Sequence, residues 1–195
     1  MYPSVTTCIS SLWNTSWIEL VEIRTPRLIL RSARPDDLEA MHAVLSDPRA
    51  TLWWSTPPHE TLDQTRAWLD GMIANGPDHP DFVIELDGRV IGKAGFWRLP
   101  DVGYILHPDC WGQGLAAEAV GAAIDHVFQT RDVNTLTADV DPENSASIRV
   151  LERLGFVRTG FAERTWNVGG VWKDSFYYAL SRVDRATAAD GQAPA

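Results

Sequence analysis

The chain has 195 residues, of which 45% are hydrophobic and 22% are charged. It carries neither a long apolar span nor an extended low-complexity tract, so we expect one compact globular domain and no membrane partner. The formal net charge of −9 argues against a nucleic-acid partner, because nonspecific binding to a phosphate backbone needs a basic face. An acidic surface suits a cationic substrate, although negative charge also serves solubility alone.

The two cysteines, Cys8 and Cys110, have no paired spacing and no histidine cluster beside them. We therefore expect no disulfide framework and no metal site, and a reducing cytoplasm is the simplest location. Residues 1–22 lack the basic start and continuous apolar core of a signal peptide, so they are predicted to be an extension before a domain at 23–182. Residues 183–195 have little to bury and are predicted to be a disordered tail.

The first half of this domain alternates between the hydrophobic periods of strands and helices. The predicted elements are a strand at 27–31, a helix from Pro35 with Leu38, Met41, Val44 and Leu45 on its apolar face, a helix at 60–74, and strands at 82–86, 90–97 and 102–106. The dipeptide Asp87-Gly88 between two of these strands is the strongest short-range hairpin signal. This order predicts an antiparallel meander that follows two helices.

The second half begins with a glycine-rich turn. The predicted elements are a helix opened by residues 112–116, a strand at 136–140, a helix at 145–154 capped by Gly155, and a terminal hairpin of 161–168 and 171–180 around Gly169-Gly170. Strands and helices in this mixed order predict an α/β sandwich. Its sheet is expected to be largely antiparallel and twisted, with helices on both faces and a parallel crossover at the glycine-led helix.

The turn from Trp111 to Ala116 has the composition of an anion site. Backbone N–H groups converge at the N-terminus of a helix, where the helix dipole is positive, and Gly112 and Gly114 allow a ligand close to the backbone. Gln113 adds a side-chain amide. The loop suits a diphosphate, but a glycine-rich turn selected for its geometry alone would look the same.

A dinucleotide fingerprint competes for the same residues. Residues 112–117 fit the pattern G-x-G-x-x-A, and Asp132 follows about twenty residues later. In the dinucleotide fold the first glycine follows its strand at once and the acidic residue ends the next strand. Here residues 107–111 intervene and Asp132 precedes the next strand, which disfavours an NAD(P)-dependent enzyme.

Three blocks in the correct order resemble the GCN5-related N-acetyltransferase (GNAT) superfamily. Residues 102–119 resemble its strand, pyrophosphate loop and helix, and residues 141–156 resemble its second block, where Asn144 begins a helix and Gly-Phe ends it. The opening at 25–31 is typical of the RimJ/RimL-like branch of protein N-terminal acetyltransferases. The resemblance covers about residues 23–182 and implies a GNAT-like fold.

The resemblance also implies how acetyl-CoA is held as co-substrate. It places the CoA pyrophosphate on backbone N–H groups of Gly112, Gln113, Gly114, Leu115 and Ala116. It pairs the backbone of Ile105 and Leu106 with the pantetheine arm, which Asn144 also hydrogen-bonds. Many members have Arg or Gln where this chain has Trp111. Tryptophan is common there in the RimJ/RimL-like branch, so this residue favours that branch.

Attack of an amine on a thioester needs a neutral nucleophile, a polarised carbonyl and a proton for the departing sulfur. Asp101 is the candidate base, acting through water, and Glu163 is the second candidate. Each residue also has a purely structural interpretation: Asp101 as an exposed turn residue, and Glu163 as a residue on a solvated strand face.

For the acid, many relatives have a tyrosine where this chain has Leu151, so Ser147 is the candidate. It lies one helical turn beyond Asn144, and in RimJ/RimL-like members this serine sits near the thioester sulfur, which also makes it a cofactor contact. A capping role is the alternative. RimL-like enzymes use a further glutamate, but that position here is Trp166. Trp53 and Trp54 are candidates for the wall of the acceptor cleft, although core packing is the commoner role for tryptophan.

The sequence thus predicts an acetyl-CoA-dependent N-acetyltransferase acting on a primary amine, either a peptide N-terminus or a small amine metabolite. Two other classes stay open. A degenerate member would bind acyl-CoA without turnover, and an NAD(P)-dependent enzyme would use the glycine loop for a dinucleotide. A monomer or a homodimer is expected.

Overall fold

The computed structural model describes residues 21–76 and 79–189. Cys8, most of the predicted N-terminal extension and the last part of the predicted tail lie outside the described residues. Of the helices within the described part, none combines the length and apolar character needed to cross a membrane.

Within the described residues, eight strands form one sheet in the order β1-β2-β3-β4-β5-β6-β8-β7. The strands are β1 (Glu22–Arg24), β2 (Leu28–Arg31), β3 (Asp81–Leu86), β4 (Arg89–Arg98), β5 (Asp101–Leu106), β6 (Thr135–Val140), β7 (Val157–Val168) and β8 (Val171–Ser181). Neighbouring strands pair antiparallel, except for β5 and β6, which are parallel. The predicted antiparallel sheet with one parallel crossover is confirmed.

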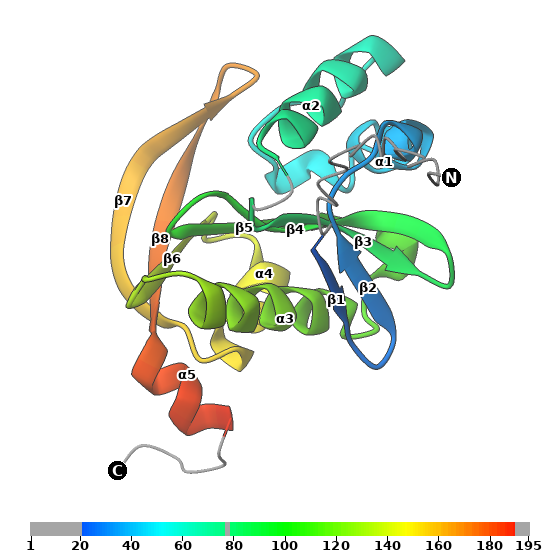
Figure 1. Ribbon diagram of the computed structural model, residues 1–195. Coiled ribbons are helices and arrows are strands. Elements are labelled where there is room, and N and C mark those ends of the chain that lie inside the picture. Colours follow the sequence, from blue (N-terminus) through cyan, green and yellow to red (C-terminus); the bar gives the residue numbers. More distant parts are fainter. Residues whose placement is uncertain (1–20, 77–78, 190–195) are drawn as a thin grey trace, which may run out of the picture.

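Helices cover both faces of the sheet, also as predicted (Figure 1). They are α1 (Leu38–Leu45), α2 (Leu62–Ala74), α3 (Leu115–Thr130), α4 (Ser145–Arg153) and α5 (Arg182–Ala189), with short 3-10 turns η1 (Pro35–Asp37), η2 (Thr51–Trp53) and η3 (Pro108–Cys110). One core lies on the side of α3 and α4, and a smaller one lies under α1 and α2. The apolar side chains Met41, Val44 and Leu45 of α1 are fully buried in the smaller core because they recur at helical spacing.

The local signals act as expected at the turns. Asp87 and Gly88 both have positive φ, 49° and 76°, which gives the two-residue turn whose twist suits a hairpin. Thr61 caps α2 by accepting from the Gln64 N–H group, and the Gln64 side chain bonds back to the cap. Gly155 ends α4 with φ of 94°, the conformation that glycine adopts most readily.

The sheet parts in its middle. The parallel strands β5 and β6 share a single residue pair, Asp101 with Thr137. On their other sides, β5 pairs with β4 and β6 pairs with β8 over several residues. Beyond that pair the two strands therefore diverge. Val102 and Leu106 of β5 pack in the core of α3 and α4, while Ile105 packs in the opposite core, so successive residues of β5 face opposite sides of the opening.

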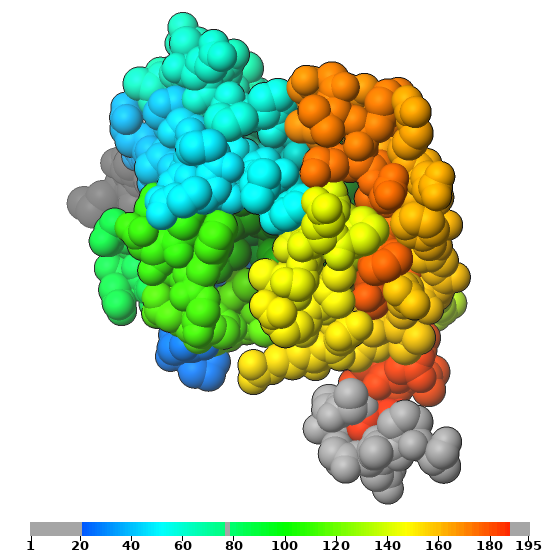
Figure 2. All heavy atoms as spheres, turned by 180° about the vertical axis from the view of Figure 1, so that it is seen from behind, coloured from blue at the N-terminus to red at the C-terminus, as the bar shows by residue number. Residues whose placement is uncertain are grey.

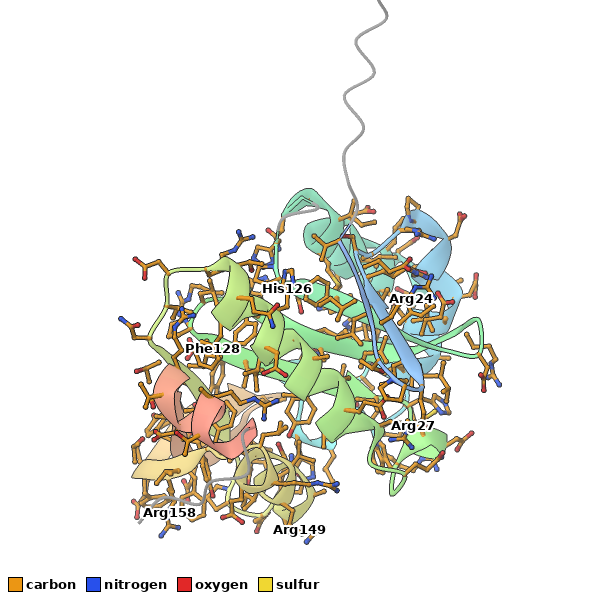
Figure 3. The ribbon with its side chains drawn as sticks, turned by 60° about the horizontal axis from the view of Figure 1, so that its bottom comes forward. Arg24, Arg27, His126, Phe128, Arg149 and Arg158 are labelled. Carbon is orange, nitrogen blue, oxygen red and sulfur yellow. The ribbon has the colours of Figure 1, made fainter. Side chains whose placement is uncertain are left out.

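The C-terminal segment corrects one prediction. Residues 182–189 form helix α5, where a disordered tail was expected. Arg182 donates to the carbonyl oxygens of Phe128, Arg131 and Val133, and Arg185 pairs with Asp125 at 2.8 Å. These bonds dock α5 on the C-terminal half of α3, which carries His126 and Phe128 (Figure 3). Charged side chains, and not an apolar stripe, hold this helix, so hydrophobic periodicity did not reveal it.

Candidate active site

The N-terminus of α3 forms an open backbone loop. Gly112 and Gly114 have φ of 72° and 77°, a region that L side chains rarely adopt. A Cβ atom on Gly112 would meet nothing within 4 Å, and one on Gly114 would meet only a guanidinium nitrogen of Arg27 at 3.7 Å. The first N–H groups of a helix have no intrahelical acceptor, so this space is a cradle for an anion. The residues present therefore fit a diphosphate.

The loop is fixed from outside by Arg27, which lies near this end of α3 (Figure 3). Its guanidinium donates to the Gln113 carbonyl at 2.9 Å and to the Glu118 carboxylate at 2.7 Å. Partial burial opposes the charge of Glu118, but hydrogen bonds from Thr25 and Arg27 outweigh it and hold the pKa of Glu118 below its ordinary value. Glu118 thus stays ionised and keeps Arg27 in place.

Two exposed side chains of the loop donate hydrogen bonds to nearby backbone carbonyls. The Trp111 indole N–H donates to the Leu106 carbonyl at 2.9 Å, and the Gln113 amide donates to the Asp109 carbonyl at 3.2 Å. Trp111 therefore braces the end of β5, which accounts for a tryptophan at this position. Ile105 is paired with Lys93 of β4. The predicted pantetheine contacts of Ile105 and Leu106 stay predictions, and the Leu106 carbonyl already has one donor.

A cavity of about 710 Å³ occupies the opening between β5 and β6. Consecutive residues of both strands line it, 101–104 of β5 and 137–140 of β6, together with Asp141 just after β6. Since successive strand residues face opposite sides of a sheet, the cavity passes through the sheet. Its other walls come from residues 52–55, from α4 and from the β7–β8 hairpin. Figure 2 shows this orange hairpin reaching the cyan segment that contains η2.

Five predicted residues line this cavity together: Asp101, Asn144, Ser147, Trp53 and Trp54. The loop at 112–116 is not part of its lining. It lies at the N-terminus of α3, on the face of the sheet that α3 and α4 cover. The structure thus brings the candidate base, acid and acceptor wall into one space, with the anion loop outside it.

Carboxylates lie on the face of the opening that α1 and α2 cover. Asp101 accepts a short hydrogen bond from the Thr137 hydroxyl. Asp139, two residues beyond Thr137 on β6, accepts from the Trp166 indole N–H at 2.6 Å. Sequence reasoning missed Asp139, although the alternation of buried Leu136, Ala138 and Val140 with Thr137 and Asp139 was the available signal.

The other face carries Asn144, Ser147 and Tyr104. Asn144 caps α4 by accepting from the Ser147 N–H group at 3.1 Å, which confirms that the two residues share one turn. The Ser147 hydroxyl lies 2.6 Å from the Tyr104 hydroxyl. Burial raises the pKa of Tyr104 to about 12, more than the hydrogen bond with Ser147 lowers it. Sequence reasoning also missed Tyr104.

Glu163 is exposed on β7 and does not line the cavity. The pairing of β7 with β8 is interrupted between Ala162 and Trp166, so residues 163–165 lie opposite Asp174 alone. Such a bulge redirects the side chains that follow it. Here it turns Trp166 into the cavity, and the geometry gives the predicted role of Glu163 no support.

Aromatic and basic side chains complete the acceptor wall. Lys173 lies over the Trp53 ring at 4.8 Å and pairs with Asp141 at 3.5 Å. Lys93 pairs with Asp81 at 2.6 Å, each side chain being 3% exposed, and lies 5.8 Å from the centre of the Trp54 ring. These cations thus have carboxylate partners. Among the described residues, no group of three or more His, Cys, Asp or Glu is arranged to hold a metal ion.

Comparisons with known proteins identify the family of this chain and several of its relatives. The profile of the acetyltransferase (GNAT) domain matches residues 27–157. An uncharacterized N-acetyltransferase of Bacillus licheniformis, p20, is 28% identical over 172 residues, covering 83% of this chain and 97% of the relative. Spermidine N(1)-acetyltransferase of Escherichia coli K12 is 26% identical over 155 residues, covering 75% and 81%. The structure of RimL, a ribosomal-protein α-N-acetyltransferase, in complex with coenzyme A shares the fold with a TM-score of 0.71, covering 83% of this chain and 98% of RimL at 21% identity.

Proposed function

The chain belongs to the GNAT acetyltransferase family, and from this premise we propose that it transfers an acetyl group from acetyl-CoA to the primary amine of a cationic acceptor. A cytoplasmic location, as the two cysteines suggest, is part of this proposal. The cavity through the sheet is the observation that supports this proposal. It connects the face that carries the carboxylates of Asp101 and Asp139 with the face that carries the hydroxyl group of Ser147.

The anion loop is assigned to the diphosphate of the co-substrate. Backbone N–H groups of residues 112–116 and the dipole of α3 bind the negative charge, and Arg27 fixes the loop without occupying it. Asn144 and the backbone of Ile105 and Leu106 are assigned to the pantetheine arm. Acetyl-CoA supplies the acetyl group as a thioester and departs as the CoA thiol.

Asp101 and Ser147 are assigned opposite proton transfers on opposite faces of the opening. Asp101 takes a proton from the acceptor ammonium through a water molecule. Ser147 donates a proton to the sulfur while the new N–C bond forms and the C–S bond breaks, and then recovers a proton from solvent. The amine nitrogen loses its second proton to solvent after the N–C bond forms, and Asp101 releases the proton it took, so one turnover liberates one net proton and returns both side chains to their starting states.

The acceptor is proposed to approach from the side of Trp53, Trp54 and the carboxylates Asp101 and Asp139. These groups favour a protonated amine before reaction, through charge and cation–π attraction. An α-amine with a pKa of about 7.7–8.0 is about 10–17% neutral at pH 7, whereas a lysine amine with a pKa of about 10.4 is about 0.04% neutral. Peptide N-termini therefore need less help from a base than lysine side chains and other alkyl amines.

A second candidate function is acyl-CoA binding without turnover. It is favoured by Leu151, where many family members have a tyrosine, and by Trp166, where RimL-like enzymes have a glutamate. On this alternative, Ser147 and Asp101 would still line the cavity but would not exchange protons with the ligand.

Incubation with radiolabelled acetyl-CoA and a panel of acceptors tests the proposal. The panel contains spermidine and a peptide with a free N-terminal alanine, with N1,N8-diacetylspermidine and the N-acetylated peptide as the blocked controls. We expect label on the free amines only. CoA binding without transfer to any acceptor would support the binding module and refute the enzyme.

A further inference from the structure

Tyr104 is a polar side chain of the cavity that the proposed mechanism does not use. It comes from β5, and its ring packs against the core beneath α3 and α4. Its hydroxyl ends 2.6 Å from the Ser147 hydroxyl and 3.4 Å from the Ser147 carbonyl oxygen. The first distance is that of a strong O–H···O hydrogen bond, and the second is too long for one.

Two arrangements of hydrogens fit this contact. Either the phenol donates to the Ser147 oxygen, or the serine donates to the phenol. A serine hydroxyl has one hydrogen and two acceptor lone pairs. In the second arrangement the serine hydrogen is donated to the phenol oxygen. The phenol hydrogen then has only the Ser147 carbonyl oxygen, 3.4 Å away, as an acceptor in the structure. In the first arrangement the phenol hydrogen has a close acceptor, and the serine hydrogen is free to be donated to a group bound in the cavity.

We propose that Tyr104 is a positioning residue that donates to the Ser147 oxygen, directs the serine hydrogen toward the departing sulfur, and strengthens Ser147 as a proton donor. This inference rests on the proposed function, because it presupposes a thioester in the cavity. The donated bond stabilises the negative charge that grows on the serine oxygen as its proton leaves.

The surroundings keep Tyr104 in the donor state. Burial raises its pKa to about 12, so the phenol carries its proton throughout the range in which enzymes work. The backbone also fixes the distance, because Ser147 is held by the Asn144 cap and Tyr104 by β5. The pair therefore needs no rearrangement when a ligand binds.

The first test is a double-mutant cycle on the rate of acetyl transfer with Tyr104→Phe and Ser147→Ala. Phenylalanine keeps the ring in the core and removes only the hydroxyl. With serine present, we expect Tyr104→Phe to lower kcat about tenfold, the effect of one hydrogen bond. With Ser147→Ala, the same change is expected to have no further effect. Tyr178→Phe is the control, because Tyr178 also lines the cavity but its hydroxyl faces Glu152 at 3.4 Å instead of Ser147. Its effect on kcat, whatever its size, is expected to be equal in both backgrounds.

The second test needs no acceptor and no turnover. CoA is bound to each variant, and the ultraviolet absorbance of its thiolate is followed while the pH is raised. A hydrogen bond donated to sulfur favours the thiolate and lowers the pKa of the thiol. We expect Ser147→Ala to raise that pKa, Tyr104→Phe to raise it by less, and the double variant to match Ser147→Ala. The charged groups of the cavity are common to all variants: Lys93, Arg98, Lys173, Asp101, Asp139, Asp141 and Asp174.

The outcomes distinguish failure of the positioning role of Tyr104 from failure of the proposed acetyl transfer. Equal effects of Tyr104→Phe in both backgrounds, or no effect in either, would overturn the positioning role while leaving acetyl transfer intact. Absence of acetyl transfer together with a Ser147-dependent shift of the thiol pKa would refute the enzyme and keep the Tyr104–Ser147 coupling.

Discussion

Gly114 gives the most quantitative test of the anion loop. Its φ of 77° costs an L residue about 1–2 kcal/mol. A Cβ atom there has room, with Arg27 at 3.7 Å as its nearest neighbour. Gly114→Ala should therefore lower the free energy of unfolding by about 1–2 kcal/mol without blocking the cradle. Gly114→Gln adds bulk, and Gly114→Glu adds the same bulk with a negative charge.

The difference between Glu and Gln isolates the charge. Two like unit charges about 6 Å apart repel by about 2.8 kcal/mol at an effective dielectric constant of about 20. Arg27 offsets part of this, which leaves about 1.4–2.8 kcal/mol, or roughly 10–100-fold weaker CoA binding for Glu than for Gln. Folding should not suffer from the charge, because a carboxylate at a helix N-terminus is favourable.

Calorimetric titration of CoA into the three variants, at low and at high salt, measures these differences. The gap between Glu and Gln should narrow at high salt, because salt screens exposed charges. Equal affinities of the Glu and Gln variants at low salt would refute the placement of the diphosphate at this loop.

Three further outcomes are expected. Asp101→Asn should lower kcat about 100-fold near neutral pH, recover toward higher pH as the amine loses its proton unaided, and leave CoA affinity unchanged in a titration; a wild-type pH–rate profile would exclude it as the base. Lys93→Met should lower the free energy of unfolding in urea by about 3–5 kcal/mol because it leaves Asp81 charged and buried, and adding Asp81→Leu should restore most of the loss; the pairing is unimportant if the single variant is as stable as wild type. Burial, with the charge of Arg131, holds the pKa of His126 below its ordinary value, so the unfolded chain binds that proton more readily. Stability should fall as the pH drops below about 6.5, and His126→Gln should make this fall shallower; an unchanged slope would contradict the assignment.

Features set by local spacing were predictable from the sequence. The turn at Asp87-Gly88, the cap at Asn144 and its Ser147 partner three residues later are each determined within a few neighbouring residues. The same holds for the glycine loop, because glycine is the residue that adopts the positive φ seen at Gly112 and Gly114 at the lowest cost.

Features that depend on distant partners were not predictable. Tyr104 and Ser147 are 43 residues apart, and Asp139 and Trp166 are 27 apart, so no spacing rule connects them. The position of Glu163 outside the cavity was not predictable either, because a bulge breaks the alternation of β7 and sends Trp166 into the cavity. Strand β1 escaped notice because three residues with one apolar side chain carry almost no periodic signal.

The single pair between Asp101 and Thr137 is the only ladder pair that links the two halves of the eight-stranded sheet in the described residues. The inner borders of β5 and β6 beyond that point resemble edge strands that face each other inside the molecule, and edge strands readily accept an extended partner. An extended ligand inserted there would complete the fold as well as occupy the site. We therefore expect CoA to bind before the amine and to slow amide hydrogen exchange in β5 and β6. The amine would then contact a surface that is formed in part by the bound CoA.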